Sequence, residues 1–257
     1  MNHGSAADER RVSQVGPMVV IANVTARALV GRRRSLLMLL LAGAPVLLAL
    51  LVRIGGRGGS GTALVPALEG LLVTTVLPLV ALVFGTAALG SELDDGTAVH
   101  VLTKPIPRWT IVVPKLVVAG GLTAILLVAS TLLTGALLGG GTSRGFSITV
   151  AFAIAIAIGS FVYTSIFLAL SAATSRGLII GLGYSLLWEG VLAGSLPGTQ
   201  LLSVHEYIRG MVAAIGPSNT LTSVVGGQGF VAAVVALVLI TLFASLRLAA
   251  YEVRGAE

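Results

Sequence analysis

"SELDDGTAVHVLTKPIPRW", residues 91–109, interrupts a chain that is otherwise almost continuous in Leu, Val, Ala, Ile and Gly. It holds three acids, Glu92, Asp94 and Asp95, then a Gly-Thr step, and its last six residues include a lysine, two prolines and an arginine. The apolar sequence on each side is long enough to cross a membrane, which takes about 20 residues. We therefore expect these residues, called the polar segment below, to connect two membrane spans.

The composition supports an all-α integral membrane protein. Of the 257 residues, 56% are hydrophobic and only 10% are charged, whereas soluble domains carry about 25% charged residues. The formal charge of +6 would suggest nucleic acid in a soluble protein. Here membrane orientation explains it, so no nucleic-acid partner is expected. Cysteine is absent, which excludes disulfides and thiolate metal sites.

Hydropathy predicts a single domain of six transmembrane helices. A polar tail at 1–16 and a short tail at 251–257 flank it. Residues 17–34 are apolar but end in an arginine cluster, and we expect an interfacial helix on the inner leaflet; a helical extension of the first span is the alternative. The spans are expected at about 35–52, 68–89, 111–138, 148–170, 178–196 and 230–250.

The basic residues predict the orientation, because Lys and Arg are retained on the cytoplasmic side. With the N-terminus inside, only four of the 16 basic residues fall outside: Arg53, Arg57, Arg144 and Arg209. Both termini and the polar segment are then cytoplasmic, and the composition suggests a bacterial plasma membrane. Residues 197–228 are outside, with a short helix expected at 202–215.

The chain lacks the motifs of several enzyme classes. A P-loop needs Lys followed by Ser or Thr, but Lys104 and Lys115 are followed by proline and leucine. The three histidines are scattered outside the expected spans, so neither a paired-histidine metal site nor a serine–histidine pair is predicted there. We expect no catalytic residue and no bound cofactor, and an intramembrane enzyme is the weakest alternative.

The polar segment resembles one family, the permease subunits of ABC-2 type exporters. Those permeases carry acids ending in Gly-Thr after their second span, followed by leucine, proline and arginine, and a lysine that opens the third span. The corresponding residues here are Glu92, Asp94, Asp95, Gly96, Thr97, Leu102, Pro105, Arg108 and Lys115. The motif match is confined to about 90–115, while the rest of the chain matches in topology.

The resemblance implies a permease that works as a dimer, with a second copy or a paralogue, on two separate cytoplasmic ATPase subunits that bind ATP and magnesium. It also implies that the polar segment docks on the ATPase, with Lys104 among its residues. A docking element of this kind needs a rigid polar structure. Acids favour a helix N-terminus, and the prolines after them stiffen the chain. A solvated connecting loop remains an alternative. A non-transporting membrane scaffold is the main rival function. The substrate stays open among drugs, lipids, glycolipids, peptides and ions.

Two further features of the fifth expected span are candidates for function. Glu189 is an ionisable group at membrane depth, where such groups are costly and usually functional. It either marks the substrate path or is paired near the outer end of the span. Small residues four apart allow helices to approach closely, within the subunit or across a dimer; they are Gly177, Gly181, Gly190 and Gly194.

Overall fold

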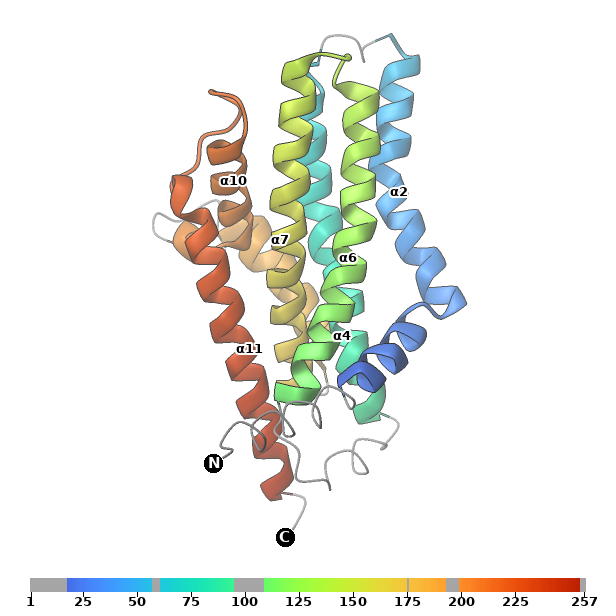
Figure 1. The fold of residues 1–257 in the computed structure, drawn as a ribbon, viewed down its shortest axis with the longest axis vertical. Coiled ribbons are helices and arrows are strands. Elements are labelled where there is room, and N and C mark those ends of the chain that lie inside the picture. Colours follow the sequence, from blue (N-terminus) through green and yellow to red (C-terminus); the bar gives the residue numbers. More distant parts are fainter. Residues whose placement is uncertain (1–17, 57–60, 95–108, 175, 193–198, 255–257) are drawn as a thin grey trace, which may run out of the picture.

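The computed structural model describes residues 18–56, 61–94, 109–174, 176–192 and 199–254. Within these residues five helices are long and apolar enough to cross a membrane (Figure 1). They are α2 (Arg32–Ile54), the continuous run of α3 (Leu64–Pro66), η2 (Ala67–Val76) and α4 (Leu77–Asp94), then α6 (Trp109–Leu138), α7 (Ser143–Ala173) and α11 (Gly229–Arg254). They correspond to five of the six expected spans.

Helix α7 is central to the packing and contacts α4, α6, α10 and α11. Its largest fully buried side chains are Phe152, Tyr163 and Phe167. Small residues let the neighbouring helices approach it. A Cβ added at Gly85 of α4 would lie 2.9 Å from the Cβ of Phe167, which is closer than packed carbons can come. This packing through small residues is typical of membrane helices.

The fifth expected span is described only in part, because residues 193–198 lie outside the described part of the chain. The apolar helix found there is short, Gly177–Val191, and consists of α8 (Gly177–Gly183) and the π-helix η3 (Tyr184–Leu192). Fifteen helical residues cover about 22 Å, less than the roughly 30 Å of a bilayer core. The expected span at 178–196 extends beyond the described helix and stays a prediction.

The chain then forms a second, shorter set of helices before α11. These are η4 (Thr199–Leu202), α10 (Val204–Ile215) and η5 (Gly226–Gln228). Helix α10 is the short helix expected at 202–215. Ser203 caps it, accepting a hydrogen bond from the N–H of Glu206 at 3.3 Å. It packs against α7 and α11 and is strongly one-sided, with Ile208, Met211 and Val212 buried.

The N-terminal helix, Met18–Leu29, is separate from α2. The chain leaves helical geometry at Val30 and Gly31 before α2 begins. In Figure 1 this helix crosses the lower end of the bundle at an angle to α2. The N-terminal helix and the first span are therefore two elements and not one continuous helix, while the interfacial position of the N-terminal helix stays a prediction.

One end of the bundle brings together the helix ends that flank the polar segment. The end of α4 and the start of α6 lie there, on the same side as the end of α11 (Figure 1). The turn between α6 and α7 lies at the opposite end, where Gly140 and Gly141 adopt positive φ values of 64° and 69° that other residues rarely tolerate. Residues 95–108 lie outside the described part of the chain.

Candidate functional site

Two acids of the bundle sit on π-helical segments, Glu69 on η2 and Glu189 on η3. Such segments are rare and are found frequently at functional sites. In η2, the hydroxyls of Thr74 and Thr75 donate to the carbonyls five residues earlier, those of Glu69 and Gly70, at 2.9 and 3.4 Å. The widened turn thus places Glu69 beside Thr74, toward α10.

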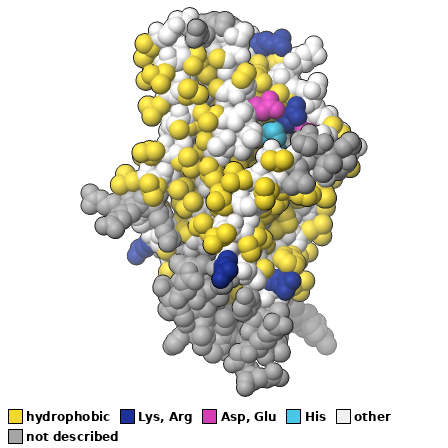
Figure 2. All heavy atoms as spheres, turned by 180° about the vertical axis from the view of Figure 1, so that it is seen from behind, with side chains coloured by type: hydrophobic (Ala, Val, Ile, Leu, Met, Phe, Trp, Pro, Cys, Tyr) yellow, Lys and Arg dark blue, Asp and Glu magenta, His cyan; other side chains and the backbone are white. Residues whose placement is uncertain are grey.

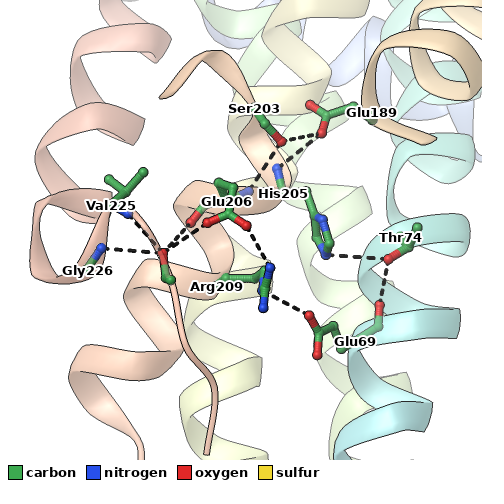
Figure 3. A network of polar contacts seen from close by, with 10 residues as sticks. Glu69, Thr74, Glu189, Ser203, His205, Glu206, Arg209, Val225 and Gly226 are labelled. Atoms are coloured by element: carbon green, nitrogen blue, oxygen red, sulfur yellow. Dashed lines mark hydrogen bonds and ion pairs between the residues drawn. The ribbon is translucent and has the colours of Figure 1, made fainter. Parts of the chain in front are cut away.

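Glu189 binds the N-terminus of α10 (Figure 3). Its carboxylate accepts hydrogen bonds from the Ser203 hydroxyl at 2.6 Å and from the N–H groups of Val204 and His205 at 3.0 and 3.4 Å. The Tyr184 hydroxyl donates a fourth at 3.2 Å. Glu189 is only 7% exposed. A carboxylate here satisfies helix N–H groups that would otherwise lack partners, and the positive end of the helix dipole favours it.

Arg209 lies between two carboxylates. Its Nε is 3.0 Å from Oε1 of Glu69 on η2, and its Nη1 donates to Oε1 of Glu206 at 2.7 Å. The Ser223 hydroxyl donates to the other oxygen of Glu206 at 3.1 Å and accepts from the N–H of Val225. Arg209 and Glu206 therefore connect the second span, α10 and the chain that leads into α11.

His205 also connects α10 to the second span, since its Nε2 lies 3.4 Å from the Thr74 hydroxyl. Burial lowers the pKa of His205 from its usual value, while the nearby carboxylates of Glu189 and Glu69 oppose that shift. The lowered pKa favours the neutral imidazole at neutral pH. The polar network is defined here as Glu69, Thr74, Glu189, Ser203, His205, Glu206, Arg209 and Ser223.

Part of this network reaches the outer surface of the bundle. The side chains of Glu69 and Arg209 are 24% and 27% exposed, and Figure 2 shows charged and histidine side chains gathered at one place on that face. The neighbouring exposed residues of the second span are Gly70, Thr74 and Thr75. From residue 61 to residue 89, the described chain exposes no large hydrophobic side chain, in contrast to α2 and α11.

A family model for ABC-2 family transporter proteins matches residues 12–251. The chain belongs to the ABC-2 transporter family. The match covers nearly the whole chain and confirms the resemblance first noticed in the polar segment. A comparison with curated protein sequences found no match.

The polar segment of this ABC-2 protein is described only at its edges. Glu92 and Asp94 belong to the last turn of α4, and the other predicted coupling residues lie outside the described part: Asp95, Gly96, Thr97, Lys104, Pro105 and Arg108. Lys115, six residues into α6, is 1% exposed and donates to the carbonyl of Ala88 in α4 at 2.7 Å. It ties together the two helices that flank the segment.

The glycines of the fifth expected span differ in their surroundings. At Gly181, an added Cβ would clash with Leu82 and lie 2.9 Å from Phe167, so this glycine packs inside the subunit. Gly177 lies against Ser171 in the same way. Gly190 is exposed, and the nearest atom to an added Cβ is the Ser185 carbonyl at 3.7 Å. Gly194 lies outside the described residues.

Sequence reasoning identified Glu189 but missed the rest of the network. It assigned no role to Glu69, His205, Glu206 or Arg209. The available signal was the i, i+4 spacing of His205 and Arg209, which puts both on one face of a short helix. Nothing in the sequence indicated that this face packs on Glu69.

Proposed function

We propose that this ABC-2 protein is the permease subunit of an ATP-driven exporter, and that the face carrying the polar network lines the path of the substrate. Family membership supports the first part, because ABC-2 permeases work with an ABC ATPase on a separate chain. In this proposal two ATPase subunits bind ATP and magnesium and dock on the cytoplasmic polar segment. The permease itself carries out no chemistry.

One observation supports the position of the path. The exposed residues of the second span are Pro66, Gly70, Thr74 and Thr75, and the last three lie beside the Glu69–Arg209 pair. Charged groups at membrane depth face a bundle interior or a water-filled cavity, because contact with lipid tails is costly. Thr74 lies well inside the span Leu64–Leu89. This face is therefore suited to an aqueous path that a second permease subunit closes from the other side.

The network also provides an element that can move. The short apolar helix and α10 are held end to end by the contacts of Glu189, and α10 is held to the second span by Arg209 and His205. A change in the second span, whose far end is Asp94 at the polar segment, would reach α10 through these contacts. We expect α10 to form the outer gate.

Purification of the tagged chain from its native membrane tests the proposal. A permease brings down an ABC ATPase in a fixed equimolar ratio, and the pair hydrolyses ATP with a rate that responds to substrate. A membrane scaffold would copurify with other proteins and with no ATPase in constant ratio. That second result would contradict the proposed function.

A further inference from the structure

Glu69 is the one carboxylate of the polar network that keeps an open acceptor. It is the only charged residue between positions 61 and 89 of the chain, and its side chain is 24% exposed. Arg209 contacts its Oε1, while its other oxygen accepts no hydrogen bond from the described residues. Both oxygens of Glu189 and both of Glu206 are engaged in buried hydrogen bonds. A ligand on this face therefore meets the free oxygen of Glu69.

Arg209 holds its two carboxylates unequally (Figure 3). Its Nη1 donates to Glu206 at 2.7 Å, and Ser223 donates to the other oxygen of Glu206. The Nε contact with Glu69 is an ion pair of 3.0 Å that lacks the geometry of a hydrogen bond. If another cation took Glu69, Arg209 would keep Glu206, so no buried charge would lose its partner. An anionic ligand would instead have to displace a carboxylate and then lie beside it.

Thr74 and Thr75 add oxygen acceptors to the same exposed face. A hydroxyl has one proton to donate, and each of these hydroxyls gives it to the backbone carbonyl five residues earlier. Their lone pairs are thus what they present outside the helix, and those of Thr74 face His205 at 3.4 Å. Hydroxyl lone pairs and a carboxylate together match a ligand that carries positive charge and N–H groups.

We propose that the face of Glu69, Thr74 and Thr75 binds the transported substrate as a protonated organic amine, which replaces Arg209 at the Glu69 carboxylate. This inference rests on the proposed function, because it names the substrate class for the path proposed there. A metal ion fits less well, since the described residues contain no group of three His, Asp or Glu that could hold one. Return of Arg209 to Glu69 would then expel the amine as α10 closes on the second span.

Paired thiol reagents test the charge preference in reconstituted full-length protein. Thr75→Cys places a thiol on this face. It reacts with a cationic reagent, trimethylammonioethyl methanethiosulfonate, or with an anionic reagent of similar size, sulfonatoethyl methanethiosulfonate, and mass spectrometry follows the labelling. The same cysteine is then combined with Glu69→Gln. The control is Glu252→Gln, which removes one negative charge near the end of α11. Circular dichroism checks that each variant is folded.

We expect the Thr75→Cys thiol to prefer the cationic reagent by about tenfold, relative to the preference of free N-acetylcysteine. Glu69→Gln should reduce this preference to about twofold or less, and Glu252→Gln should keep it. Benzylamine, protonated at neutral pH, should slow the labelling, whereas neutral benzyl alcohol should not.

The outcomes separate this inference from the proposed path. Equal preference for both reagents, or labelling that benzylamine does not slow, would overturn the amine site and leave an aqueous path in place. A tenfold preference that survives Glu69→Gln would overturn the role of this carboxylate. A thiol that reacts with neither reagent would contradict the path itself, and the inference would fall with it.

Discussion

The carboxylate of Glu189 accepts a hydrogen bond from the hydroxyl of Ser203 at 2.6 Å, although the two residues are 14 positions apart. This contact joins the end of the short apolar helix to the start of α10. The Val204 N–H donates to the same carboxylate at 3.0 Å. Glu189 therefore serves as a helix cap supplied by another segment, and it determines where α10 begins relative to η3.

Replacing Glu189 by alanine should destabilise the protein by about 1–3 kcal/mol, because buried donors lose their acceptor. Glu189→Gln should fall between alanine and wild type, since an amide nitrogen cannot accept from the backbone N–H groups of α10. Unfolding in detergent, followed by circular dichroism, measures both. Tyr184→Phe is the control, because it removes only the 3.2 Å contact. If Glu189→Gln matches wild type in stability and in transport at every pH, Glu189 is a packing residue.

Stability should fall as the pH is lowered from above 7 toward 5.5, in part through His205. Burial lowers the pKa of His205 in the folded protein, while in the unfolded chain it stays near 6.5. Between these two values the unfolded chain binds more protons, so acid favours unfolding. Glu69, Glu189, Glu206 and Arg209 also act on His205.

The variant His205→Gln should therefore show a flatter dependence of the unfolding midpoint on pH than wild type. His3→Gln, in the N-terminal tail, serves as the control and should leave the dependence unchanged. A His205→Gln protein with the same pH dependence as wild type would show that the histidine does not titrate in this window.

The acids of the polar segment should be needed for coupling and not for folding. Replacing Glu92, Asp94 and Asp95 by alanine should leave membrane insertion intact and should uncouple transport from ATP hydrolysis by the partner. ATPase rate and transport are measured together in proteoliposomes. Replacing Glu252, near the end of α11, and Glu257 by alanine is the control. Normal export by the triple variant would contradict the coupling role.

Two glycines should separate folding from dimerisation. Gly181→Leu should destabilise the subunit itself, by about 1–3 kcal/mol, because Leu82 and Phe167 leave no room for a side chain. Gly190→Leu meets open space within the subunit, so it should weaken the dimer without loss of subunit stability. Subunit stability and dimer fraction in detergent are measured in parallel. An unchanged dimer in the Gly190→Leu protein would place the interface elsewhere, for example on α2.

The sequence predicted the long helices well, because 20-residue apolar runs leave few alternatives for a backbone in lipid. The span expected at 178–196 stays a prediction, because the described apolar helix covers only Gly177–Val191 and residues 193–198 lie outside the described part of the chain. Glu189 stood out because a lone carboxyl in an apolar run is costly. Glu69 and Arg209 did not stand out, since each residue taken alone could lie at the membrane–water interface. Only tertiary packing shows that they are 3.0 Å apart.

Thiol accessibility at Thr74 tests the central claim most directly. The chain contains no cysteine, so a single introduced cysteine is the only thiol of the protein that can react with the reagent. A cysteine at Thr74 should react in intact cells with a hydrophilic, membrane-impermeant thiol reagent, at a rate that changes when the ATPase is active. A cysteine at Leu239, exposed on α11, should react only with a lipid-soluble reagent. If the Thr74 cysteine behaves like the Leu239 cysteine, this face meets lipid or a dry contact, and it does not line the transport path.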